Sequence, residues 1–196
     1  MLGLKMPTDP RWINIAEKNI QEILSDHAYC EQKAASNAIS IIIQYPMYSD
    51  LVEAMTAICQ EEMTHFDMVH KKLQERGLSL GFERKDAYVN DLAKYLKQTK
   101  TQSSKKGFFV NQMLFSAMIE ARSCERFKIL SEEIRDEDLR EFYRSLMESE
   151  ARHYTTFLGF ARKYSNGIDV DKCWGDFLIF EANLMEKYGK SETMHG

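Results

Sequence analysis

The chain has 196 residues, of which 44% are hydrophobic and 29% charged, with nine Gly and three Pro. This length suits one domain with a substantial core, and the composition is typical of a helical globular protein rather than a disordered or β-rich one. A formal net charge of −4 gives no global attraction to nucleic acid, so binding RNA requires a local basic patch. Four Cys without a C-x-x-C pair argue against a disulfide framework and against a thiolate zinc site.

The sequence predicts a cytoplasmic protein that makes no membrane contact. The longest apolar run, residues 38–43, is far too short to span a bilayer and is interrupted by Ser40. Residues 1–7 lack the apolar core of a signal peptide. Reduced thiols fit the same compartment.

Apolar residues recur at helical spacing along most of the chain. A helix start at Thr8-Asp9-Pro10 opens the first pattern, and a second cap is expected at Ser25-Asp26. The first long helix is predicted to end near Gln44. The later predicted helices cover about 49–76, 86–97, 108–134, 136–164 and 169–188. Helix breaks are expected at Pro46, Gly77 and Asn166-Gly167. Residues 99–107 are predicted to form an exposed mobile loop, and the tail from Gly189 is expected to be frayed.

Two Glu-x-x-His motifs, Glu62/His65 and Glu150/His153, lie in the second and fourth long helices. Residues at i and i+3 share a helix face, so each pair can converge on one metal ion. Taken alone, the two pairs are explained equally well as solvated or capping residues.

Glu31 and Glu120 change that balance, because each lies among small and apolar neighbours where an unpaired carboxylate is costly. Glu31 precedes Glu62 by 31 residues and Glu120 precedes Glu150 by 30, with a helix break midway in each case. If each break is a tight turn, the paired residues lie at one level, roughly 22 Å from their hairpin loop. One Glu from each of two helices with Glu-x-x-His from the other two is the pattern of ferritin-like di-iron or di-manganese bundles.

The sequence therefore predicts an all-α, ferritin-like four-helix bundle of two antiparallel hairpins, joined by a long crossover over 78–107 and accompanied by short extra helices. It is expected to be a single domain of residues 1–196. Oxygen and nitrogen donors favour two iron ions, with manganese possible, and leave coordination positions open for dioxygen. The predicted metal ligands are Glu31, Glu62, His65, Glu120, Glu150 and His153. The di-iron centre itself is the catalytic group, and no separate catalytic side chain is assigned.

Several neighbours of the ligands have open roles. Glu61 and Ser149 lie four residues before the two ligand His, so they are placed either to orient those rings or to face solvent. His27 lies four residues before Glu31, a spacing that allows it to reach the site, but a solvent or packing role is expected. Cys59 and Cys124 share the ligand faces, and small apolar packing is expected for both.

Four segments resemble the tRNA 2-methylthio-isopentenyl-adenosine hydroxylases: Glu-Gln-Lys-Ala-Ala (31–35), Glu-Glu-x-x-His-Phe (61–66), Ile-Glu-Ala-Arg-Ser-Cys-Glu-Arg-Phe (119–127) and Glu-Ser-Glu-Ala-Arg-His-Tyr (148–154). The resemblance covers nearly the whole chain and matches all six ligand positions. It implies a non-haem di-iron monooxygenase that uses dioxygen and external electrons, from a reductase or a ferredoxin-like donor, to hydroxylate the isopentenyl group of a modified adenosine in the tRNA anticodon stem-loop. The rival classes are a ferritin-like storage protein, a rubrerythrin-like peroxide scavenger, a radical-generating reductase subunit and a non-enzymatic bundle.

Two basic clusters are candidates for holding RNA phosphates, although a solvated Lys-rich loop is the commoner explanation of such clusters. The first comprises Lys97, Lys100, Lys105 and Lys106, and the second Lys71, Lys72, Arg76, Arg84 and Lys85. Phe66 and Met118 are candidate lining for a prenyl pocket. The oligomeric state is left open.

Overall fold

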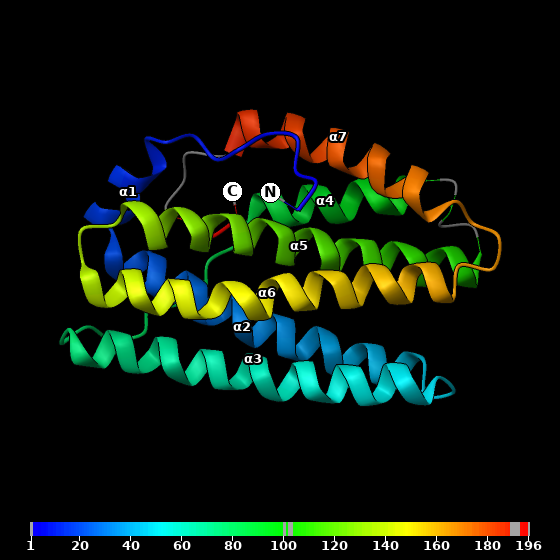
Figure 1. The fold of residues 1–196 in the computed structure, drawn as a ribbon, viewed down its shortest axis with the longest axis horizontal. Coiled ribbons are helices and arrows are strands. Elements are labelled where there is room, and N and C mark those ends of the chain that lie inside the picture. The colour runs from blue at the N-terminus through cyan, green and yellow to red at the C-terminus, as the bar shows by residue number, and fades with distance from the viewer. Residues whose placement is uncertain (1, 100, 102–103, 189–192, 196) are drawn as a thin grey trace. The chain divides into compact units, whose positions relative to one another are not determined.

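The computed structural model describes residues 2–99, 101, 104–188 and 193–195. These residues form helices and connecting segments, with no strand among them (Figure 1), so the all-α prediction is confirmed. The helices are α1 (Trp12–Lys18), α2 (Ile20–Gln44), α3 (Ser49–Glu75), α4 (Ala87–Gln98), α5 (Lys105–Glu133), α6 (Glu137–Lys163) and α7 (Val170–Tyr188). None of the described helices has the length and apolarity needed to cross a bilayer.

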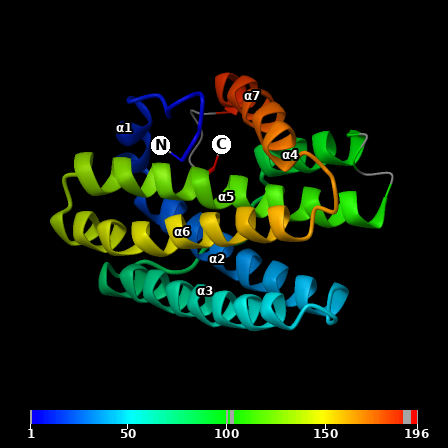
Figure 2. The same cartoon turned by 45° about the vertical axis from the view of Figure 1, so that its right-hand side comes forward.

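The described residues group into two compact units, each built on one helical hairpin. The first, here called the α2–α3 unit, comprises residues 18–85 and 192–194. Its two long helices lie antiparallel and side by side (Figures 1 and 2), joined by a short turn at Pro46. Glu31 lies thirteen positions before the end of α2 at Gln44, and Glu62 thirteen positions after the start of α3 at Ser49. The predicted register of this hairpin is therefore confirmed.

The second unit, the α5–α6 unit, comprises residues 1–17, 86–191 and 195–196. Its hairpin repeats the same register, because Glu120 lies thirteen positions before Glu133 and Glu150 thirteen positions after Glu137. Asp136 caps α6 by accepting a hydrogen bond from the Leu139 amide at 3.1 Å. The two shorter helices α4 and α7 pack against α5.

A buried charged network joins α5 to the rest of its unit. The Arg122 guanidinium donates to Glu181 of α7 at 2.6 Å and to Glu125 at 2.9 Å. The Tyr88 hydroxyl of α4 also donates to Glu181, at 2.8 Å, and the amide and hydroxyl of Thr8 donate to Glu125. Because these groups are removed from water, they depend on one another for their hydrogen bonds. The network therefore fixes α4, α7 and the N-terminal segment on one face of α5.

The predicted helix cap at Ser25-Asp26 is wrong, because both residues lie buried inside α2, which begins at Ile20. Their side chains instead accept hydrogen bonds from backbone amides that are distant in the sequence. The Ser25 hydroxyl accepts from the Gly81 amide at 3.0 Å, and the Asp26 carboxylate accepts from the Met194 amide at 2.7 Å. Polar residues that look like a cap in sequence are here anchors for two later segments of the chain.

The segment predicted as a loop over 99–107 is shorter than expected. Helix α5 starts at Lys105, where Ser104 caps it by accepting from the Gly107 amide at 3.0 Å. Thr101 donates its hydroxyl proton to Asn111 at 3.0 Å. Residues 100, 102 and 103, including one of the four lysines predicted to bind RNA, lie outside the described residues.

The prediction of a frayed tail is wrong for residues 193–195, whereas 189–192 and 196 lie outside the described residues. Met194 and His195 are buried, with 1% and 2% of their surface exposed. The His195 ring places Nε2 3.0 Å from the Ser123 hydroxyl and Nδ1 3.7 Å from the Asp86 carboxylate. A polar composition gave no hint of these partners, because they lie far away in the sequence.

Candidate metal centre

The α2–α3 hairpin brings together three of the six predicted ligands. Glu31, Glu62 and His65 are all buried, and each offers one ligand atom within 4.8 Å of the others. His65 Nδ1 lies 3.4 Å from Glu62 Oε2 and 3.8 Å from Glu31 Oε2. The helical spacing of Glu62 and His65 places both on the face of α3 that meets α2, as the motif predicted.

His27 was expected to have a solvent or packing role, although its spacing also allows it to reach this site, and it contacts a ligand directly. Its Nε2 lies 2.6 Å from Glu31 Oε1, and the ring is 1% exposed. The expected solvent or packing role is therefore wrong. The signal was the four-residue spacing from Glu31, which places both side chains on one helix face. By holding one carboxylate oxygen, His27 fixes the orientation of Glu31.

Proton affinity in this triad is high. Burial and the neighbouring Glu62 carboxylate raise the pKa of Glu31 well above its ordinary value. Burial disfavours the His65 imidazolium, but contacts with Glu31 and Glu62 outweigh that effect and raise the pKa of His65 to about 10. The metal-free triad therefore retains protons, which a divalent cation has to displace.

The α5–α6 hairpin brings together the other three predicted ligands. Glu120, Glu150 and His153 are buried, and their ligand atoms lie within 4.8 Å of one another. His153 Nδ1 lies 4.0 Å from Glu120 Oε2. Each hairpin thus supplies the same set, which is one Glu from its first helix and a Glu-x-x-His pair from its second.

The donor chemistry of each triad fits iron or manganese. Two carboxylates and one imidazole are donors of the type that both metals accept. Cys124 is not such a donor, because burial and the Glu150 carboxylate raise the pKa of its thiol to about 12, and its Sγ donates to the Met147 carbonyl. The packing role predicted for Cys124 agrees with this environment.

Other predicted neighbours take varied positions. The Ser149 hydroxyl donates to the Leu146 carbonyl of its own helix at 2.7 Å, and Glu61 is half-buried. Met118 is fully buried, whereas Phe66 is half-buried and stacks on His70 with ring centroids 6.4 Å apart. A role for Glu61 in orienting a ligand stays a prediction, as does a prenyl pocket lined by Phe66 and Met118.

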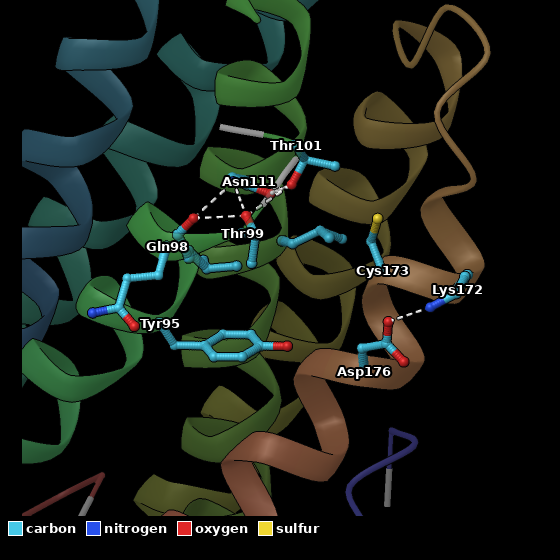
Figure 3. Close-up of a pocket in the computed structure, with 10 residues that line it drawn as sticks. Tyr95, Gln98, Thr99, Thr101, Asn111, Lys172, Cys173 and Asp176 are labelled. Carbon is cyan, nitrogen blue, oxygen red and sulfur yellow. Dashed lines mark hydrogen bonds and ion pairs between the residues drawn. The ribbon is translucent and has the colours of Figure 1, made fainter. Parts of the chain in front are cut away.

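A cavity of about 550 Å³ lies within the α5–α6 unit, away from the predicted ligands. Figure 3 shows Tyr95 of α4 extending across it toward Lys172 and Asp176 of α7, which form an ion pair at 2.6 Å. The Asn111 amide donates to the Leu96 carbonyl at 3.1 Å and to the Thr99 hydroxyl at 2.9 Å. Because these polar groups satisfy one another, they tie the end of α4 to α5.

The two basic clusters differ in how their charges are balanced. Lys71 forms an ion pair with Asp67 at 2.6 Å, and Lys72 with Glu75 at 3.1 Å. In the first cluster the described members are Lys97, Lys105 and Lys106. All three are exposed, and none of them has an ion-pair partner among the described residues. The second basic cluster is therefore the weaker candidate for phosphate binding.

Comparison with known proteins gives consistent matches along the chain. The model of the family described as tRNA-(MS[2]IO[6]A)-hydroxylase (MiaE) matches residues 2–196. A protein from Pseudomonas putida named tRNA 2-(methylsulfanyl)-N(6)-isopentenyladenosine(37) hydroxylase is 35% identical, over 98% of this chain and 91% of that protein. A protein of the same name from Salmonella typhimurium is 27% identical, over 83% of this chain and 76% of that protein.

Among solved structures, the fold resembles that of a Synechococcus protein with aldehyde deformylating oxygenase activity. The TM-score is 0.87 at 30% sequence identity, and the match covers 98% of this chain and 95% of the other. That neighbour is a ferritin-like di-iron oxygenase, so the predicted fold class is confirmed.

Proposed function

The chain belongs to the tRNA-(MS[2]IO[6]A)-hydroxylase (MiaE) family, and we propose that it hydroxylates the isopentenyl group of 2-methylthio-isopentenyl-adenosine in tRNA. It is a non-haem di-iron monooxygenase of ferritin-like fold. The observation that carries the proposal is the pair of buried Glu/Glu/His triads, one in each hairpin and each at the same distance from its hairpin loop.

The proposed di-iron centre takes all six ligands. Glu62 and Glu150 each share a helix with a ligand His, and together with Glu31 and Glu120 these residues would hold the two ions. Four carboxylates balance two divalent ions, which makes a buried centre tolerable. Because three ligands come from each unit, the proposal requires both units to act as one domain of residues 1–196. Iron fits the family, and manganese is the alternative metal.

The protein's own groups prepare the site for the reaction. His65 and His153 fix the position of the metals, and His27 holds one oxygen of Glu31 so that its other oxygen stays available. Apolar residues of the long helices keep water away from the reacting groups. When bound and reduced, an iron pair supplies the electrons and open coordination positions for dioxygen activation.

The reaction needs two electrons from outside the protein, because neither the carboxylate nor the imidazole ligands are redox-active. A reductase or a ferredoxin-like protein is the proposed donor. The proposed substrate is the anticodon stem-loop of tRNA, and the proposed location is the cytoplasm.

The decisive experiment combines reduced, iron-loaded protein with prenylated tRNA and ¹⁸O₂, followed by mass analysis of the nucleosides. One oxygen atom from dioxygen should enter the isopentenyl group. His65→Ala and His153→Ala should abolish turnover while the helical content is retained. Label arriving from water, or no product from fully loaded and reduced protein, contradicts the proposed reaction.

A further inference from the structure

A small groove lies between α4 and α5, on the side of the basic cluster. It has a volume of about 170 Å³, and its walls include Phe108, Phe115 and Lys97. Phe108 is 43% exposed although it is a large apolar side chain. An aromatic ring that is open to solvent and next to a second aromatic ring forms a stacking surface rather than part of the core.

The chain segments that line the groove carry positive charge and no negative charge. From Leu92 to Ile119 the sequence contains five Lys and no Asp or Glu. Lys97 lines the groove, whereas Lys105 and Lys106 begin the helix that carries Phe108. All three are exposed, and no carboxylate among the described residues neutralises them. This local excess contrasts with the net charge of −4 for the whole chain.

A half-buried glutamine supplies a third feature. Gln112 lines the groove one turn after Phe108, and its Oε1 atom has no hydrogen-bond partner within the described part of the chain. An amide oxygen without a partner in the protein is available to the edge of a ligand, after a rotation of the side chain. Gln is a residue type that can recognise the edge of a base through both its donor and its acceptor.

We propose that this groove is a stacking subsite for one unpaired base of the substrate RNA. The base stacks on Phe108 beside Phe115, its edge meets Gln112, and the adjoining phosphates contact Lys97, Lys105 and Lys106. Aromatic stacking beside a positively charged surface is how proteins hold single-stranded nucleic acid. This inference rests on the proposed function only in taking tRNA as the RNA.

The position of the groove separates this base from the one that reacts. Phe108 precedes Glu120 by twelve residues on α5, which corresponds to roughly 18 Å along the helix axis. The stacked base is therefore a neighbour in the anticodon loop, not the prenylated adenosine. The subsite contributes to the binding and register of the RNA, whereas the proposed hydroxylation takes place near Glu120.

A binding assay with an anticodon stem-loop RNA tests the subsite, using 2-aminopurine placed in turn at each unpaired loop position. Stacking on Phe108 should quench the fluorescence at one position. Phe108→Ala should remove that quenching and weaken binding about tenfold, and Phe108→Trp should restore both. Ile179→Ala removes an exposed apolar side chain of α7 and should leave binding unchanged.

Salt dependence separates stacking from charge. Phe108→Ala should leave the slope of log affinity against log salt unchanged, whereas the triple Lys97→Gln, Lys105→Gln, Lys106→Gln variant should reduce it. Lys128→Gln, at the far end of α5, is the matched control for charge. Wild-type affinity for Phe108→Ala, or an equal loss for Ile179→Ala, overturns the subsite. The assay does not depend on turnover, so RNA binding without hydroxylation contradicts only the proposed reaction.

Discussion

At the scale of single residues, two histidines of the α2–α3 unit show how position determines role. His27 is buried against Glu31, with Nε2 2.6 Å from the carboxylate. His70 is half-buried and stacks on Phe66. Only the first is placed to affect metal binding.

We expect His27→Ala to weaken iron binding roughly 10- to 100-fold, which is the usual effect of removing a group that orients a metal ligand. His70→Ala is the matched control and should bind iron like the wild type. Competition with a chelator of known affinity measures both. Equal iron affinity in His27→Ala and the wild type means that Glu31 is oriented without His27.

The stability of the metal-free protein should fall as pH rises. The pKa values of Glu31 and His65 are raised in the folded state, that of His65 to about 10 from 6.5, so the folded protein binds more protons than the unfolded chain. Their contribution is fully present below the unfolded pKa values and is lost as pH rises toward the folded ones. Urea midpoints of metal-free protein should therefore decrease between pH 6 and pH 9.

The control for this pH effect is the iron-loaded protein, in which the ligands carry metal instead of protons. Its urea midpoint should change less over the same range. A midpoint that rises with pH in the metal-free protein contradicts the protonated triad.

At the scale of elements, two neighbouring arginines of α5 have opposite environments. Arg122 is bonded to Glu181 and Glu125 in the network that holds α4 and α7. Arg126 lies 4.0 Å from the ring centre of Trp12, and among the described residues its guanidinium nitrogens have no hydrogen-bond partner. Burial and the charge of Arg122 lower the pKa of Arg126 to about 9, which shows that its charge is poorly compensated.

Replacing each arginine by methionine should distinguish these environments. Arg122→Met leaves two carboxylates buried without their partner and should destabilise the protein by about 3–5 kcal/mol. Arg126→Met removes a poorly compensated charge and keeps apolar contact with Trp12, so it should be neutral or stabilising. Urea denaturation measures both. A loss as large for Arg126→Met as for Arg122→Met means that stacking on Trp12 outweighs the burial of the charge.

The sequence predicted those elements whose signals are local. The end of α3 before Gly77 and the start of α6 at Asp136 follow from residues within one turn. The common level of the ligands follows from the helical period and from the break at Pro46, midway between Glu31 and Glu62. Ser25 and Asp26 were misinterpreted because their partners are more than fifty residues away. The period of a helix identifies the face that a side chain occupies, but not which distant backbone group it meets.

At the scale of the whole molecule, the two hairpins supply equivalent halves of one proposed centre. We expect two irons per chain in protein reconstituted anaerobically, measured by elemental analysis. Glu62→Ala and Glu150→Ala each remove a proposed metal ligand from a different unit, and each should lower the iron content. Less than one iron per wild-type chain, or an unchanged content in both variants, contradicts a shared centre.

The location of the tryptophans has a consequence for spectroscopy. The chain contains two Trp, and both belong to the α5–α6 unit, where Trp12 lies under Arg126 and Trp174 lies beside Tyr154. Indole emission therefore reports on that unit alone, whereas far-UV circular dichroism sums the helices of both. If the two signals change at the same urea concentration, the α2–α3 hairpin unfolds together with the unit that carries the fluorophores. If they separate, the hairpin without tryptophan has a transition of its own, invisible to fluorescence.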